Sequence, residues 1–244
     1  SLTVGNTSSV SFINNSSSGN GGAISSHNGG TLIVTCTFTG NSGSFGGALF
    51  YLTSAGTFTV SNSTFTNNTA VTGNAGAIRS GGNLTLTNST FTNNSAAGNG
   101  GAIWHTTNSL SISGSTFDGN YTSALGDGGA IYLVSASGTA TVDNTNFNNQ
   151  NNVLIDDGAG IYIDGAIGGA VVEVNGGGFS GNSATGNGGG IAVSAAGTLT
   201  IGNTSGVTFT NNTAGVGGGA IYHNGISPFS ISNSTFQNNA ALNG

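Results

Sequence analysis

The chain has very few charged residues, and among its 244 residues there is no lysine and no methionine. Its basic side chains are one arginine, Arg79, and 3 histidines, while 7 acidic residues bring the formal net charge to −6. Proteins that bind nucleic acid or an anionic membrane surface use clusters of Lys and Arg against phosphate groups. The composition therefore excludes nucleic acid and anionic membranes as electrostatic partners.

Cysteine and long apolar runs are scarce as well. Cys36 is the only cysteine, so the chain cannot form an internal disulfide, and its neighbours Val34 and Phe38 predict that it is a small buried residue. No run approaches the roughly 20 apolar residues that a transmembrane helix needs, so no transmembrane segment is predicted. No stretch has the i, i+3, i+4, i+7 spacing of an amphipathic helix, which leaves strands and turns.

The residues that are abundant form a repeat of 26 to 32 residues. The repeat is marked by a phenylalanine, which occurs at Phe12, Phe38, Phe65, Phe91, Phe117, Phe147, Phe179, Phe209 and Phe236. Three positions after each phenylalanine stands an amide residue, namely Asn15, Asn41, Asn68, Asn94, Asn120, Gln150, Asn182, Asn212 and Asn239. A second marker, GGAI or a close variant, starts at Gly21, Gly46, Ala75, Gly100, Gly128, Gly158, Gly188 and Gly218. A fixed period of this length indicates a repeat architecture.

Each repeat is predicted to hold about three short strands, because alternating runs such as GTFTVSNSTF (residues 56–65) are rich in Thr, Val and Phe. One repeat cannot bury its apolar side alone, whereas stacked repeats share a continuous core. We therefore predict an all-β fold, a single-stranded parallel β-helix (β-solenoid) of about nine coils that forms one domain over residues 1–244. Strand patterns run into both ends, so we expect no cap at either end.

Stacking places equivalent positions of all coils in one column, and each column then has one chemical role. We expect the phenylalanines and the Ile of GGAI to point inward, and the amide residues to form a structural ladder of hydrogen bonds at a turn. The residues just before the glycines are expected at a left-handed turn position, which Asn and Asp tolerate. They are Asn20, Asn74, Asn99, Asp127, Asp157 and Asn187.

The residue after GGAI forms an outward column that reads Ser25, Phe50, Arg79, Trp104, Tyr132, Tyr162, Ala192 and Tyr222. Stacked aromatic side chains with one arginine are suited to contact another protein or the apolar faces of sugar rings. The alternative is that the stack only stabilises its face of the β-helix. The residues predicted to bind a partner are Phe50, Arg79, Trp104, Tyr132, Tyr162 and Tyr222.

Acidic residues cluster at Asp127, Asp156, Asp157 and Asp164. Asp127 and Asp157 occupy equivalent turn positions, so we expect their carboxylates one coil apart, where they repel unless they share a proton or a cation. This pair is the candidate for a weak Ca²⁺ site, with solvated turn residues as the alternative. No other cofactor is expected.

Polysaccharide cleavage by a β-helix enzyme is the enzymatic alternative. It requires grouped carboxylates and a basic group near the developing anion. Arg79 lies two to three coils before the acidic residues in sequence, and no lysine is present. The three histidines, His27, His105 and His223, fall in separate coils without a matching acid, so no triad or zinc set emerges. We predict a non-enzymatic protein without catalytic residues.

The paired signature GGA(I/L) and FxxN, repeated along the chain, resembles the repeats of the chlamydial polymorphic membrane proteins and of autotransporter-type, adhesin-like β-helix passengers. The resemblance implies a right-handed β-helix that is extracellular, displayed on the cell surface and used for adhesion. The first functional hypothesis is therefore an adhesin-like protein whose aromatic column contacts a cell-surface protein or glycan. The second is a filament subunit that associates end to end or laterally with its own copies, and the third is the polysaccharide-active enzyme.

Overall fold

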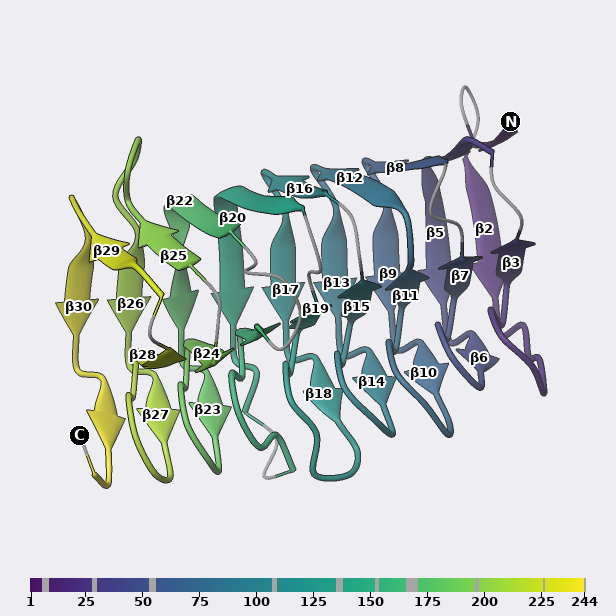
Figure 1. Ribbon diagram of the computed structural model, residues 1–244. Helices are drawn as coiled ribbons and strands as arrows, with labels where there is room; N and C mark the ends of the chain where they lie inside the picture. The colour runs from purple at the N-terminus through teal and green to yellow at the C-terminus, as the bar shows by residue number, and fades with distance from the viewer. Residues whose placement is uncertain are drawn as a thin grey trace.

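The computed structural model is a parallel β-solenoid whose coils stack along one axis (Figure 1). The structure describes residues 1–5, 9–27, 30–52, 56–106, 109–134, 138–151, 154–165, 171–195, 198–225 and 227–243. Strands of successive coils pair in parallel, and each of the eight intervals between the nine phenylalanine positions is one complete turn. The described residues contain no helix, and hence none long and apolar enough to cross a membrane. The predicted fold class is confirmed.

Three faces of the coil carry the strands of the described residues. The GGAI sheet has eight strands: β3 (Ile24–His27), β7 (Leu49–Leu52), β11 (Ile78–Ser80), β15 (Ile103–Thr106), β19 (Ile131–Val134), β21 (Ile161–Asp164), β24 (Ile191–Ala195) and β28 (Ile221–Gly225). Short strands at the turn form two smaller sheets: β6 (Ser42–Gly43), β10 (Thr69–Ala70), β14 (Ser95–Ala96) and β18 (Tyr121–Thr122), then β23 (Ser183–Ala184), β27 (Thr213–Ala214) and β31 (Ala240–Ala241).

The third face is a 16-stranded sheet with two strand positions per coil, which we call the Phe sheet. The strands before the phenylalanine are β1 (Leu2–Val4), β4 (Leu32–Val34), β8 (Thr57–Ser61), β12 (Asn83–Thr87), β16 (Leu110–Ser113), β25 (Thr198–Ile201) and β29 (Phe229–Ile231). The strands that contain it are β2 (Val10–Ile13), β5 (Cys36–Thr39), β9 (Thr64–Thr66), β13 (Thr90–Thr92), β17 (Thr116–Asp118), β26 (Thr208–Thr210) and β30 (Thr235–Gln237). Two long strands, β20 (Thr139–Asn148) and β22 (Val171–Ser180), run through both positions.

The phenylalanine column fills the interior of the solenoid. Neighbouring rings stack nearly parallel, with centroids 4.6 to 4.9 Å apart and interplanar angles of 1° to 8°. Rings from Phe38 to Phe209 are at most 1% exposed. The leucine, isoleucine and valine side chains of the other inward columns join them in one continuous core. Cys36 belongs to this core, as predicted, and its burial raises the pKa of the thiol.

The amide column forms the predicted ladder, and its members from Asn41 to Asn212 are fully buried. Asn94 illustrates the pattern. Its Oδ1 accepts hydrogen bonds from the backbone N–H and the Nδ2 of Asn68, at 3.0 and 2.9 Å, and its own Nδ2 donates to the carbonyl oxygen of Phe65 at 2.9 Å. Gln150 takes the same place in a longer coil, where Oε1 accepts from the N–H of Asn120 and Nε2 donates to the carbonyl oxygen of Phe117. One side chain per coil thus satisfies buried backbone groups of the preceding coil.

The left-handed turn positions differ from those predicted. None of the Asn and Asp residues just before the glycines has a positive φ. The left-handed residue is instead the first residue of the GGAI element, such as Gly100 with φ 70° or Ala75 with φ 69°. A second left-handed position lies between the phenylalanine and the ladder, as at Asn93 with φ 52°. The prediction was wrong because the Asn and Asp side chains before the glycines accept hydrogen bonds from the backbone of the next coil.

The second glycine of the GGAI element permits close contact between coils. A Cβ atom on Gly76 would lie 2.1 Å from the carbonyl oxygen of Gly101, and one on Gly101 would lie 2.1 Å from that of Gly129. These distances are far below van der Waals contact. A side chain at this position would therefore force the stacked turns apart.

The ladder predicts that Asn94→Ala strongly destabilises the fold. The substitution leaves the N–H of Asn68 and the carbonyl oxygen of Phe65 without buried partners, and unsatisfied groups of this kind cost about 1–3 kcal/mol each. We expect a loss of about 4 kcal/mol in the free energy of unfolding, measured by urea denaturation. The control is Asn93→Gly, which changes an exposed neighbour that has a positive φ. Equal urea midpoints for the two variants would contradict the structural role of the ladder.

Candidate functional site

The residues after GGAI form one continuous column on the outer side of the GGAI sheet, which we call the outer column. Strand pairing aligns Ser25, Phe50, Arg79, Trp104, Tyr132, Tyr162, Ala192 and Tyr222 in direct register. They alternate with inward residues such as Ile103 and His105, which are fully buried. The period-2 alternation of the strands therefore brings the six predicted binding residues together on one face.

The outer column is more covered than an open contact face would be. Phe50 is 3% exposed and Tyr132 is 8% exposed, so most of each ring is shielded from solvent. Arg79, Trp104, Tyr162 and Tyr222 are partly exposed. The accessible part of the column consequently falls into two sections, one around Arg79 and Trp104 and one around Tyr162 and Tyr222.

Arg79 is held between aromatic rings. Its Cζ lies 4.4 Å from the ring centroid of Trp104, 5.0 Å from that of Phe50 and 5.6 Å from that of Phe45. The Nε atom is buried and makes no hydrogen bond, and burial lowers the pKa of the guanidinium. Cation–π contacts contribute about 0.5–2 kcal/mol each, and the contribution is larger where the cation is shielded from water. The positive charge is therefore stabilised by π-electrons on the outer face.

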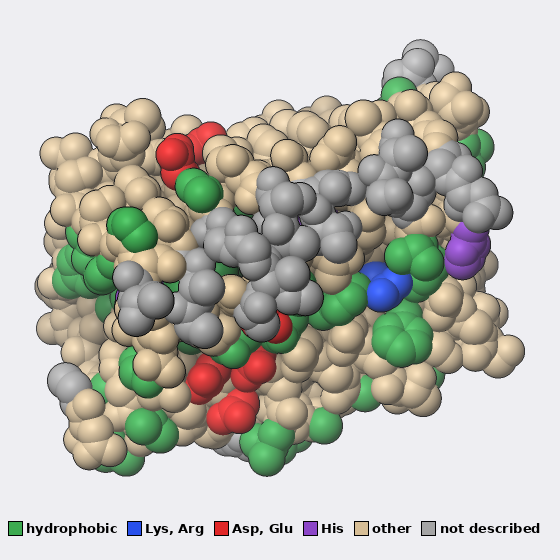
Figure 2. Space-filling model, viewed as in Figure 1, with side chains coloured by type: hydrophobic (Ala, Val, Ile, Leu, Met, Phe, Trp, Pro, Cys, Tyr) green, Lys and Arg blue, Asp and Glu red, His purple; other side chains and the backbone are tan. Residues whose placement is uncertain are grey.

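Acidic side chains gather beside the tyrosines of the same face. Figure 2 shows the arginine flanked by hydrophobic side chains and, toward the C-terminal coils, a group of acidic side chains. The Tyr132 hydroxyl donates a hydrogen bond of 2.9 Å to Oδ2 of Asp164, and the Tyr132 and Tyr162 rings stack at 5.1 Å. Burial and the Asp164 carboxylate raise the pKa of Tyr132, so its hydroxyl stays protonated. The outer column thus has a cationic section at Arg79 and Trp104. Its other section, from Tyr132 to Tyr222, is flanked by Asp157 and Asp164, and we call it the acidic section.

Asp127 and Asp157 belong to a second ladder, formed by the residues before the glycines. Oδ1 of Asn99 accepts from the N–H of Asp127 at 3.0 Å, and Oδ1 of Asp127 accepts from the N–H of Asp157 at 3.2 Å. Oδ1 of Asp157 in turn accepts from the N–H of Asn187. Each side chain therefore binds the backbone of the next coil, which explains why it does not need a left-handed conformation.

The paired carboxylates carry an electrostatic cost. Burial, with smaller contributions from Asp157, Asp156 and Asp164, raises the pKa of Asp127 to about 6, and burial also raises the pKa of Asp157. No group of three or more His, Cys, Asp and Glu side chains is arranged to hold a metal ion in the described part of the chain. A weak Ca²⁺ site at Asp127 and Asp157 stays a prediction. If the melting temperature does not change on titration with Ca²⁺, the predicted site is excluded.

The other titratable groups lie apart from the acidic section. His27 is at the N-terminal end of the GGAI sheet with its ring 5.1 Å from Phe50, whereas His223 lies in the last strand of that sheet, 5.1 Å from the ring of Phe229. His105 points into the core and is fully buried. Arg79 is in the row before Trp104, two rows from Tyr132 and three from Asp164. The arrangement brings no basic group to the carboxylates that a polysaccharide-cleaving site would use.

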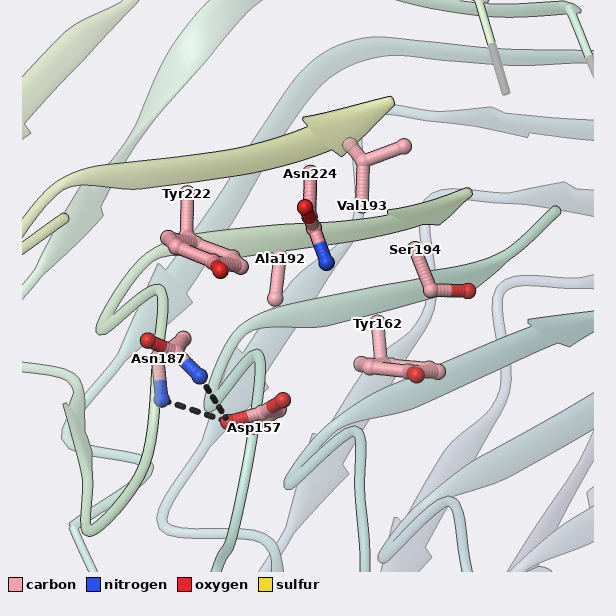
Figure 3. Close-up of a pocket in the computed structure, with 8 residues that line it drawn as sticks. All are labelled: Asp157, Tyr162, Asn187, Ala192, Val193, Ser194, Tyr222 and Asn224. Atoms are coloured by element: carbon pink, nitrogen blue, oxygen red, sulfur yellow. Dashed lines mark hydrogen bonds between the residues drawn. The ribbon is translucent and has the colours of Figure 1, made fainter. Parts of the chain in front are cut away.

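A small cavity, which was not predicted from the sequence, interrupts the acidic section. Its volume is about 150 Å³, and its lining includes Tyr162, Ala192, Tyr222, Asp157 and Asn224 (Figure 3). It lies where Ala192 takes the place of an aromatic residue in the outer column. Its signal in the sequence was the alanine between two tyrosines of an aromatic column.

Comparison with known proteins gives a family match for the repeat. The model of the Chlamydia polymorphic membrane protein (Chlamydia_PMP) repeat matches residues 9–27, 88–106, 114–133, 179–194 and 206–224. The matched segments include both the phenylalanine–asparagine turn and the GGAI strand. No curated protein and no solved structure matches the chain.

The raised pKa of Asp127 predicts a pH-dependent stability. The pKa of Asp127 is about 6 in the folded state and about 4 in the unfolded state. Between these two values the folded state binds more protons than the unfolded state, so stability falls as pH rises through this window. Asp127→Asn retains the acceptor oxygen, as Asn99 does one coil earlier, but carries no charge. We expect this variant to melt at a higher temperature than the unsubstituted protein at pH 7 and to lose that advantage at pH 4. A difference in melting temperature that does not change with pH would contradict the assignment.

Proposed function

We propose that this chain, which carries repeats of the Chlamydia polymorphic membrane protein family, is a non-enzymatic section of a surface-displayed protein that adheres to another cell. The family description names membrane proteins, which supports a location at the cell surface. The observation that carries the adhesive role is the outer column, a row of aromatic side chains around one arginine on a continuous parallel sheet. The partner of the Arg79 and Trp104 section is a cell-surface protein.

The chemistry of the Arg79 section favours a protein partner. Tryptophan and arginine are the residue types that most often dominate protein–protein binding energy, because they bury large areas and make directed contacts. Here the Cζ atom of Arg79 lies 4.4 Å from the ring centroid of Trp104, and both side chains are partly exposed. The guanidinium has little freedom to lose on binding, since three rings already hold it.

The carboxylates support a non-catalytic role. A glycosidase needs one carboxyl group free to protonate the substrate and another free to attack or to activate water. Asp127 and Asp157 each use an oxygen to bind the backbone of the next coil. Asp164 is bound to the hydroxyl of Tyr132. These contacts give the carboxylates structural partners within the protein.

Trp104→Ala is expected to weaken adhesion. Loss of a central tryptophan contact reduces affinity by about tenfold or more. The measurement is binding of beads coated with the purified chain to cultured cells, and Thr85→Ala, on an exposed position of the Phe sheet, is the matched control. Circular dichroism verifies that both variants fold. Equal adhesion of the two variants would exclude the Arg79 section as the contact face.

A filament subunit is the second candidate. Coils of this fold pair in parallel and in direct register, and a coil of a second copy can stack on the sheet in the same way. Electron microscopy of the purified chain separates the candidates: long rods support the filament, and uniform single particles exclude it.

A further inference from the structure

The outer column lacks one ring. Tyr162, Ala192 and Tyr222 occupy consecutive rows, so a methyl group stands where its neighbours carry phenol rings. Strands of adjacent coils are roughly 4.8 Å apart, which places the Tyr162 and Tyr222 rows roughly 9.5 Å apart. The inner phenylalanine column shows that rings stack at 4.6 to 4.9 Å in this fold. The gap at Ala192 therefore has the thickness of one additional ring.

The gap is a defined cavity. In Figure 3 the Ala192 methyl group lies between the rows of the two tyrosines, with Asp157 and Asn187 at one end and Ser194 at the other. Its volume of about 150 Å³ is similar to that of an engineered protein cavity that binds benzene. The site is thus large enough for one six-membered ring and too small for a larger ligand to be enclosed.

Polar groups around the cavity distinguish between ring types. Both hydrogen bonds that Asp157 accepts from Asn187 use Oδ1, which leaves Oδ2 to accept from a ligand. The exposed side chain of Asn224 extends toward Ala192 (Figure 3). An apolar ring would leave these groups without hydrogen bonds, at a cost. A hydroxylated ring supplies donors and acceptors to them while its C–H groups face the tyrosines.

The negative charge around the cavity excludes anionic ligands. Asp157 lines the cavity, Asp164 is two residues from Tyr162 on the same strand, and the chain has a net charge of −6. Carboxylated or sulfated sugars would be repelled. We propose that the cavity at Ala192 binds a single neutral pyranose ring of a cell-surface glycan, placed between Tyr162 and Tyr222. The inference deepens the proposed adhesive function, because the cavity belongs to the same outer column.

The test is saturation-transfer NMR with glucose, galactose, mannose and N-acetylglucosamine, with sialic acid as the charged comparison. The unsubstituted protein is expected to give signals with at least one neutral sugar and none with sialic acid. Ala192→Tyr completes the column and fills the cavity, so we expect it to abolish the signal and raise the melting temperature. Ser25→Tyr is the matched control, since it adds a tyrosine to the same column at an exposed position far from the cavity, and binding should persist.

Tyr222→Ala provides a second variant that does not depend on filling the cavity, and we expect it to weaken sugar binding by about tenfold. The inference is overturned if no neutral sugar gives a signal, or if sugar binding survives both Ala192→Tyr and Tyr222→Ala. The outcome is separable from that of the proposed function. Adhesion that depends on Trp104, without any sugar signal, would retain the protein contact and exclude the sugar site. A sugar signal together with adhesion that does not depend on Trp104 would retain only the sugar site.

Discussion

Stacking of the coils in direct register is the constraint on which the rest of the structure depends. Parallel strand pairing fixes the spacing of adjacent coils, so each position of the repeat lies directly against its equivalents above and below. A residue type is therefore acceptable only if it stacks well on itself. Phenylalanine does so through parallel rings, and asparagine does so because one amide both donates and accepts. Charged side chains do not, which explains their scarcity in the chain.

The functional face follows from the same constraint applied to the outside of the coil. The outer column does not need to fill the core. It carries the only arginine of the chain, and Asp164 lies beside it, hydrogen-bonded to Tyr132. Arg79 is stabilised between rings of adjacent rows, while Asp127 and Asp157, forced into one column, acquire raised pKa values. Ala192 is the one place between Phe50 and Tyr222 where the column has no large side chain. Each residue that differs from the others in its column therefore changes the chemistry of the surface at that point.

Most of the fold was predictable, because the register depends only on counting residues between repeats. The phenylalanine column, the amide ladder and the alignment of the outer column all follow from the spacing, and the structure confirms them. The left-handed positions could not be predicted. Asn99 and Asp127 are residue types that favour a left-handed turn, but their side chains accept hydrogen bonds from the backbone N–H groups of the next coil instead. The burial of Phe50 and Tyr132 was also not predictable, because it depends on neighbouring side chains and not on alternation within a strand. Arg79 and His27 lie beside Phe50, and Tyr162 stacks on Tyr132.

Residue-resolved hydrogen exchange measures the central claim most directly, namely that the buried amide ladder holds the coils in register. The N–H groups of Asn41, Asn68, Asn94 and Asn182 donate to the side chain of the next coil and are fully buried. We predict that these amides exchange as slowly as those of the central strands, although they lie at a turn. Exchange of the ladder amides as fast as that of ordinary exposed turns would contradict it.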